Sequence, residues 1–489
     1  MGRKNKVSKI SQPVKSKTQR NLTPSQLELE ELIDKLLRIS TLPQQPTVQK
    51  SLENQKEISN ITERVKKLEV DKDAKSSVDN RAIGATVGNF MKWASENGAQ
   101  LNGCSIEEFE GYGLGVKANV DIAESSLVIA VPRKLMMSVE NAKESILKDL
   151  IEKDKILGSM PNVTLAIFLL LEKFKGDSFW KPYIDILPKK YTTVLYFSID
   201  ELEELRGSPT LEIALKQIKS ISRQYAYFYK LFATSDDPVS KIMRTRFSYT
   251  EYCWAVSTVM TRQNTIPFQE NYYALIPLWD MCNHTNGTIS TAYNPVLDRS
   301  ECLAVKNFKA GEQLFIFYGS RSNADLFVHN GFVFENNDYD CYWIRLGISK
   351  SDPLQQKRNH LLSKLSISST CDFSIRKGAK PIDGQLLAFL RVFNMNEEQL
   401  DHWINSDKSA DLGYIDCALD TALEAKSWRF LHARLKLLLS TYKTTLEEDE
   451  KFISEAQATP NRLMAIKMRT TEKRIIRETL EYVEQYIQH

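Results

Sequence analysis

The feature that most constrains the fold of this chain is a change in sequence pattern near residue 345. Between about residues 85 and 335, short apolar runs bounded by turn residues, such as 127–131 and 313–317, predict β-strands among longer helical stretches. Beyond the change the segments are long and amphipathic, and the last begins at Thr459-Pro460, a helix cap followed by a first-turn proline. The sequence therefore predicts a mixed α+β domain followed by an all-helical domain.

Five segments have helical length and an amphipathic period, at 162–174, 201–232, 385–393, 427–442 and 460–487. No internal repeat at solenoid periods is present, so the chain is not predicted to be a repeat array.

The N-terminal segment is strongly basic. Residues 1–20 hold seven Lys or Arg and no acid, which leaves 58 Lys+Arg against 62 Asp+Glu, a charge of −4, on the rest of the chain. We expect a solvated, disordered tail there, with a nuclear-import or RNA-contact segment as the alternative. Thr23-Pro24-Ser25-Gln26 then predicts a capped helix start. Residues 21–84 are predicted to be a helical extension that packs on a larger body, with partner binding as the alternative.

Composition excludes several classes of function. The net charge of +3 argues against nucleic acid as the main ligand. The seven cysteines contain no C-x-x-C and the six histidines no H-x-x-x-H, so no metal site is predicted. The longest apolar run, near 165–171, is far below the length of about 20 residues that spans a bilayer. We expect a monomer in the cytosol, with the nucleus as a further compartment, and no membrane association.

Three polar motifs remain to carry chemistry. They are the glycine-rich turn at 110–115, the run from Asp280 to Gly287 after an apolar stretch, and the segment from Gly311 to Gly319, where Tyr318 follows a strand. Each motif alone is also compatible with ordinary turn chemistry.

In their order and spacing, the three motifs resemble the SET-domain methyltransferases. Three further marks, at 178–188, 254–262 and 439–449, resemble the branch that includes the plant Rubisco lysine methyltransferases. This resemblance covers roughly residues 85–480. It implies a SET domain of small β-sheets with knot-like C-terminal threading at 85–335, a helical insertion at about 140–262, and an all-α substrate-binding domain at 336–489.

Within that branch the chain strongly resembles the animal actin-histidine N-methyltransferases, with nearly identical residues at 91–99, 259–264, 276–287 and 441–445. The first 80 residues resemble that family much less. The resemblance implies an S-adenosylmethionine-dependent protein-L-histidine N-tele-methyltransferase that modifies one histidine of actin. Two alternatives stay open, a protein-lysine methyltransferase acting on histones or other proteins and a non-enzymatic actin or peptide binder.

The resemblance also implies the site residues. The cofactor would contact Arg81, Glu110, Gly111, Tyr112, Arg262, Asp280, Met281, Cys282, Asn283, His284, Asn330, Gly331 and Phe332. The substrate would contact Gln263, Trp279, Ile316 and Arg321, and the catalytic residues would be Asn264 and Tyr318. Placing Arg81 requires an alignment gap, and the family usually has Ser at Asn330, so only a backbone contact carries over there. We expect His284 to cradle the cofactor through backbone atoms and not to act as an acid or base; a core histidine is the structural alternative.

The choice between histidine and lysine as acceptor turns on protonation. A lysine, with a pKa of about 10.4, must lose a proton before attack, whereas imidazole, at about 6.5, is mostly neutral at cellular pH and needs its ring held in place. Asn264 is suited to hold the far ring nitrogen, and Trp279 offers a flat wall. Lysine-modifying relatives commonly carry Phe at the position of Asn264. The alternative interpretations are an ordinary loop Asn at 264 and a strand-end core aromatic at Tyr318.

Overall fold

The computed structural model describes residues 23–43, 45, 47–70, 83–266, 272–455 and 457–487. The predicted basic tail at 1–20 and the predicted contact Arg81 lie outside these residues. Within the described part, no helix is both long enough and apolar enough to span a bilayer.

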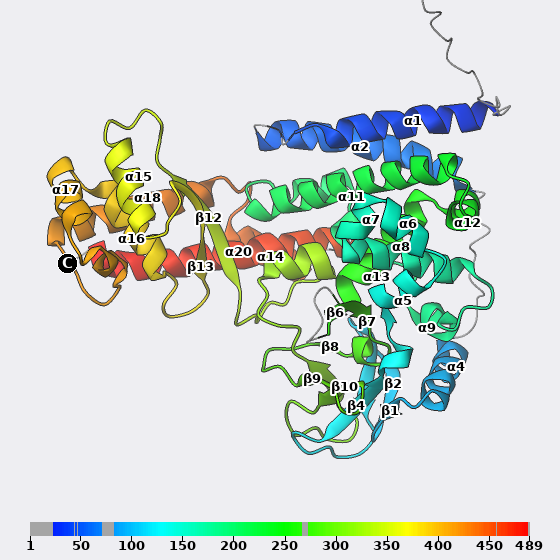
Figure 1. Ribbon diagram of the computed structural model, residues 1–489. Coiled ribbons are helices and arrows are strands. Elements are labelled where there is room, and N and C mark those ends of the chain that lie inside the picture. Colours follow the sequence, from blue (N-terminus) through cyan, green and yellow to red (C-terminus); the bar gives the residue numbers. More distant parts are fainter. Residues whose placement is uncertain are drawn as a thin grey trace, which may run out of the picture.

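The N-terminal region forms two antiparallel helices, α1 (Pro24–Thr41) and α2 (Val48–Leu68), followed by α4 (Ile83–Glu96). The capping box predicted at Thr23 is present, since its side chain accepts from Gln26 N and the Gln26 side chain accepts from Thr23 N. Both helices pack against the long helix α11 (Pro209–Thr234), as Figure 1 shows. Glu69, buried after α2, accepts bonds from Tyr225 Oη and Tyr249 N, both at 2.8 Å. The α1–α2 pair is therefore part of the folded body.

Short strands build the first domain. They are β1 (Gln100–Leu101), β2 (Cys104–Phe109), β3 (Gly113–Ala118), β4 (Leu127–Pro132), β5 (Met137–Ser138), β6 (Gln263–Thr265), β7 (Tyr273–Leu275), β8 (Asn283–His284), β9 (Thr291–Asn294), β10 (Arg299–Leu303) and β11 (Gln313–Ile316). They form three small sheets with the orders β1-β4-β10-β9, β2-β3-β11-β8 and β5-β7-β6. Among the described pairs, β8–β11 is parallel and the others are antiparallel. The strands predicted at 127–131 and 313–317 are confirmed.

A block of helices is inserted between β5 and β6. It contains α5 (Val139–Glu144), α6 (Lys148–Lys153), α7 (Lys155–Ser159), α8 (Pro161–Phe174), α9 (Lys181–Ile186), α10 (Ile199–Glu203), α11, α12 (Pro238–Arg246) and α13 (Tyr249–Arg262). The single helix predicted at 201–232 is wrong. The chain turns at Gly207, whose φ is +96° and whose missing Cβ would lie 2.7 Å from the Thr441 carbonyl oxygen, and a new helix begins at Pro209. The amphipathic period continues across this break, so periodicity alone did not reveal it.

The second domain is helical, as predicted, with one addition. Its elements are β12 (Cys341–Gly347), α15 (Gln355–Lys364), β13 (Thr370–Arg376), α16 (Gly384–Asn394), α17 (Glu397–Asn405), α18 (Thr421–Ser440), α19 (Leu446–Glu455) and α20 (Pro460–Ile487). The sequence analysis did not anticipate β12 and β13, which form an antiparallel pair over seven registered positions. Alternate residues of β12 are buried against the helices, so the pair closes one side of the second core.

Helix α20 joins the two domains. Ala465 and Met468 contribute to the core of the first domain, whereas Ile476 and Val483 contribute to that of the second. Figure 1 shows α20 running from beside α14 (Asn323–Asp325) past β12 and β13 to the far helices.

Buried polar groups fix α20 at this joint. Asp449 accepts from Arg469 Nη2 and from Lys473 Nζ, each at 2.6 Å. Glu472, which is 1% exposed, accepts from Ser208 Oγ at 2.9 Å, Thr210 Oγ1 at 2.7 Å and Tyr442 Oη at 2.9 Å. The start of α11 and the second domain therefore meet on one carboxyl group.

The stability of this joint should depend on pH through Glu472. Burial raises the pKa of Glu472 to about 7 although the three hydroxyl donors lower it, so the unfolded chain releases this proton at lower pH than the folded protein does. Stability from this group is present below about pH 4.5 and is lost as pH rises to about 7, by at most roughly 3 kcal/mol. Glu472→Gln should remove that slope.

Thermal denaturation of the wild type and Glu472→Gln between pH 5 and 8 measures the effect. We expect the melting temperature of the wild type to fall relative to that of the variant as pH rises. Melting temperatures that change with pH by the same amount in both proteins would contradict the role assigned to Glu472.

Candidate functional site

One four-stranded sheet brings the three sequence motifs together. The turn between β2 and β3 carries the first motif, β8 the second and β11 the third. Leu314 is paired with Val116, and Phe315 and Ile316 lie beside Asn283 and His284. Segments that are some 200 residues apart in sequence thus meet where β11 ends between β3 and β8, a place that we call the sheet edge.

Tyr318 closes this edge through both its backbone and its side chain. Its backbone N–H donates to His284 Nδ1 at 3.2 Å, and its hydroxyl donates to the Cys282 carbonyl oxygen at 2.7 Å. Tyr318 therefore holds the end of β11 against the segment that precedes and forms β8.

His284 is held as a neutral ring. Burial and, as the smaller cause, the positive charge of Arg321 together lower its pKa to about 4. Because Nδ1 accepts a bond from Tyr318, the proton of the neutral ring must sit on Nε2. The His284 ring therefore acts as a hydrogen-bond acceptor between strands, not as a group that exchanges protons near neutral pH.

Asn283 ties the first motif to the other two. Its Nδ2 donates to the Leu114 carbonyl at 3.2 Å and to Gln313 Oε1 at 2.7 Å. Gly115 allows this approach, since a Cβ there would lie 2.8 Å from Gln313 Oε1 and 2.9 Å from Phe109 Cδ2. The glycine is therefore required by close packing.

The first turn is open to solvent. Gly111 and Gly113 have φ of +77° and +72°, so the turn needs glycine at both positions. Glu110 is exposed, and Tyr112 is 52% exposed with its ring edge-on to Phe315 at 5.6 Å. These predicted cofactor residues lie at the mouth of the sheet edge, where a ligand can reach them.

A further group of predicted cofactor residues, 330–332, begins at the last residue of the π-helical turn η4 (Leu326–Asn330). Asn330 Oδ1 accepts from Arg321 Nη1 at 2.9 Å, so a predicted cofactor residue orients a predicted substrate residue. Gly331 has φ of +78°, and a Cβ there would lie 2.8 Å from the Thr192 carbonyl carbon. The Phe332 ring lies 6.0 Å from that of His284. The sequence did not predict the use of the Asn330 side chain.

The predicted catalytic residue Asn264 and the predicted substrate residue Gln263 lie on β6, whereas the substrate residues Trp279 and Ile316 lie in the turn η3 (Trp279–Met281) and on β11. Asn264, on β6, donates from Nδ2 to the Arg262 carbonyl at 3.1 Å. Trp279 and Ile316 are 8% and 5% exposed, so each offers an apolar surface more than a polar contact.

An ion pair links the residue before β6 to the turn η3. Arg262 Nη1 donates to the Asp280 carbonyl at 2.6 Å and lies 3.3 Å from Asp280 Oδ2. Tyr183, which was not predicted as a site residue, donates to Asp280 Oδ2 at 2.5 Å. Tyr183 lies in the segment 178–188, which the sequence linked to the family resemblance but to no role in the site.

Three buried polar atoms at this place have no hydrogen-bond partner among the described residues, namely Arg262 Nε, Asp280 Oδ1 and Gln263 Oε1. They comprise one donor and two acceptors, which fits a ligand that carries both an amino and a carboxylate group. In the same described part, no three His, Cys, Asp or Glu side chains are grouped to hold a metal ion.

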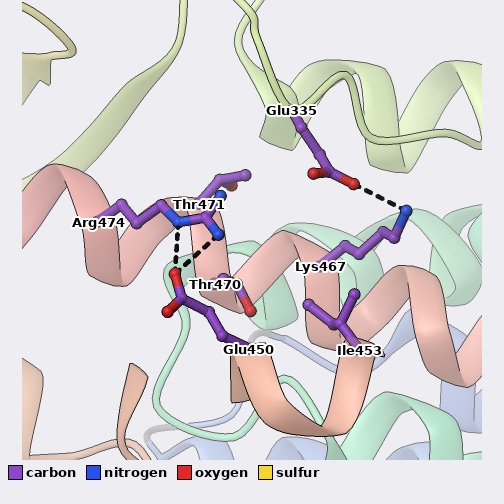
Figure 2. A pocket seen from close by; sticks show the side chains of 7 residues that line it. All are labelled: Glu335, Glu450, Ile453, Lys467, Thr470, Thr471 and Arg474. Atoms are coloured by element: carbon purple, nitrogen blue, oxygen red, sulfur yellow. Dashed lines mark hydrogen bonds and ion pairs between the residues drawn. The ribbon is translucent and has the colours of Figure 1, made fainter. Parts of the chain in front are cut away.

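A separate cavity of about 150 Å³ lies at the joint of the domains (Figure 2). Its lining residues are Glu335, Glu450, Ile453, Lys467, Thr470, Thr471 and Arg474. None of the predicted site residues is among them. Its two cations are already paired, Lys467 with Glu335 and Arg474 with Glu450, each at 2.8 Å. The sheet edge, and not this cavity, is therefore the candidate active site.

Comparison with known proteins identifies the class of protein to which the two domains belong. Residues 113–319 match the SET domain family, and residues 349–476 match the Rubisco LSMT substrate-binding family. The structure of Rubisco LSMT bound to AdoMet has the same fold, with a TM-score of 0.66 at 23% identity over 82% of this chain and 92% of that one. The SET domain of LSMT bound to lysine and AdoHcy gives a TM-score of 0.67 at 23% identity over 83% of this chain and 92% of that one. The chain therefore combines a SET domain with a domain of the Rubisco LSMT substrate-binding family.

Relatives that match most of the chain identify the family within this class. The Gallus gallus actin-histidine N-methyltransferase is 43% identical over 98% of this chain and 81% of its own length. The Xenopus tropicalis enzyme is 46% identical over 80% and 69%, and the Homo sapiens enzyme 41% over 98% and 81%. This chain belongs to the actin-histidine N-methyltransferase family, and the resemblance noted from the sequence is confirmed.

The protonation state of His284 can be measured directly. Nuclear magnetic resonance of the ¹⁵N-histidine-labelled protein should show the His284 ring titrating at about pH 4, with the proton on Nε2 above that pH, because burial and Arg321 both disfavour the cation. The signal is assigned by its loss in His284→Gln. Titration near pH 6.5 would contradict the buried acceptor role.

Proposed function

We propose that this chain is an S-adenosylmethionine-dependent protein-histidine N-methyltransferase that transfers one methyl group to a histidine of actin. The observation that carries the proposal is Asn264, which lies on β6 in a chain similar to actin-histidine N-methyltransferases along nearly its whole length. Residence in the cytosol and nucleus and a monomeric state belong to the same proposal.

The cofactor fits the sheet edge. When bound, S-adenosylmethionine supplies an electrophilic methyl group on a positively charged sulfur. The residues that would hold it are the exposed turn at 110–112, Arg262, the run 280–284 and the group 330–332. Arg262 Nε and Asp280 Oδ1, a donor and an acceptor with no hydrogen-bond partner among the described residues, match the amino-acid end of this molecule. Positioning does most of the catalytic work in such a transfer.

Asn264 can select a neutral imidazole. Its Nδ2 is fixed by the Arg262 carbonyl, which turns Oδ1 into the acceptor for one ring N–H. The ring nitrogen that keeps its proton then lies against Asn264, and the other nitrogen presents its lone pair to the methyl group. When the Nδ1–H of the ring is the donor to Asn264 Oδ1, Nε2 is the acceptor of the methyl group, which is the N-tele product that the family resemblance implies. A lysine can also donate to Oδ1, but near neutral pH its ammonium form has no lone pair with which to attack the methyl group.

Tyr318 would define the channel between the two ligands. Its hydroxyl stays protonated, because burial raises its pKa, and it donates to the Cys282 carbonyl. The ring is thereby fixed beside His284, at 5.1 Å between ring centroids.

The proposal is tested by incubating the purified protein with actin and S-adenosylmethionine and mapping the modified residue by mass spectrometry. We expect a single methyl on one histidine. Methylation confined to lysine would favour the lysine-methyltransferase alternative. Absence of cofactor binding by calorimetry would favour a non-enzymatic binder.

The role of Asn264 gives a sharper test. Asn264→Phe should lower the rate of histidine methylation at least tenfold, the effect of losing about 1.4 kcal/mol or more of transition-state stabilisation. Asn405→Phe is the matched control, because that exposed amide also donates to a backbone carbonyl, at 2.8 Å, on α17. Equal rates for the wild type and both variants would sink the assignment.

A further inference from the structure

A fully buried tyrosine of the helical insertion contacts Asp280 of the candidate site. Tyr183, on α9, is 0% exposed, and its hydroxyl donates to Asp280 Oδ2 at 2.5 Å across 97 residues of sequence. The Asp280 side chain is itself only 2% exposed. This bond and the contacts of Arg262 with Asp280 both join the insertion to the turn η3.

Asp280 connects Tyr183 to residues on both sides of the site. On one side it holds Arg262, whose carbonyl accepts from Asn264. On the other, the chain reaches Cys282 two residues later, and the carbonyl of Cys282 accepts from Tyr318. Tyr183 touches neither proposed ligand position by any described hydrogen bond, yet one carboxylate connects it to both.

We propose that Tyr183 is a positioning residue, whose hydroxyl keeps Asp280 ionised and directed at Arg262, so that η3 and the end of α13 stay aligned for cofactor binding. The inference rests on the proposed S-adenosylmethionine-dependent function and extends it to a residue outside the SET motifs.

The charge balance at Asp280 supports this role. Burial raises the pKa of Asp280, while Arg262 and the Tyr183 hydroxyl lower it. The titratable groups that interact with this carboxyl are Arg262 from α13, Tyr183 from α9, Tyr191 from the segment after α9, Cys282 from the end of η3 and Tyr318 from the end of β11. Burial raises the pKa of Tyr183 well above its usual value, so its hydroxyl remains a donor at all working pH values. Without that donor, Asp280 takes up its proton at higher pH and loses its attraction for Arg262.

Tyr183→Phe tests the proposal with two readouts. Calorimetric affinity for S-adenosylmethionine should weaken on acidification at a pH about one unit higher than in the wild type, the scale expected for one lost hydrogen bond to a buried charge. In ¹³C-aspartate-labelled protein without cofactor, the Asp280 carboxyl should titrate at correspondingly higher pH. The NMR readout does not depend on the identity of the acceptor or on any methyl transfer.

Tyr225→Phe is the matched control. Tyr225 is equally buried, and its hydroxyl donates to Glu69 Oε1 at 2.8 Å, away from the sheet edge. A purely structural role for Tyr183 predicts that both variants lose stability and that neither shifts the Asp280 titration. That result would overturn the proposal.

If Tyr183→Phe does not fold, Asp280→Asn replaces it. The variant should bind S-adenosylmethionine at least tenfold more weakly than the wild type at neutral pH, because its side chain carries no charge. Its affinity should no longer fall on acidification. Wild-type affinity with an unchanged pH dependence would overturn the proposal. A protein that binds cofactor as expected but methylates only lysine contradicts the proposed function alone, so the two failures are distinguishable.

Discussion

The parallel pairing of β8 with β11, closed by Tyr318, is the constraint on which the site depends. Two registered pairs, Phe315 with Asn283 and Ile316 with His284, are too few to hold strands by themselves. Side-chain hydrogen bonds complete the pairing. His284 Nδ1 accepts from the Tyr318 N–H, the Tyr318 hydroxyl donates to the Cys282 carbonyl, and Asn283 Nδ2 donates to the Leu114 carbonyl on β3. Residues that would otherwise belong to separate loops are thereby fixed as one edge.

The rest of the molecule holds that edge rigid. The inserted helices deliver Tyr183 and Arg262 to the turn η3, and α1 and α2 pack on α11, the longest helix of that insertion. Helix α20 shares its residues between the two cores, and Glu472 joins it to the start of α11. A site that works by positioning needs such support, because small displacements of the reacting groups cost large factors in rate.

The sequence could predict the order of the motifs but not their supporting contacts. Strands at 127–131 and 313–317 were evident because each is a short apolar run between turns, and the helix at 460–487 because its cap and first-turn proline are local signals. Tyr183 was missed as a site residue because its bond to Asp280 is long-range and its motif looks like helix packing. The break at Gly207 was missed because the contact with Thr441 that requires it lies on another domain. Likewise, the Asn330 side chain finds Arg321 only once the π-helical turn has formed.

The central claim is that Asn264 fixes a neutral imidazole ring so that only its far nitrogen meets the cofactor. The most direct measurement is chromatography of hydrolysed, methylated actin against the two N-methylhistidine isomers and the methyllysines. An Asn264 Oδ1 that is turned toward the substrate by the Arg262 carbonyl and accepts from the Nδ1–H of the ring predicts N-tele-methylhistidine as the sole product. Detection of the N-pros isomer or of methyllysine as the main product would contradict it.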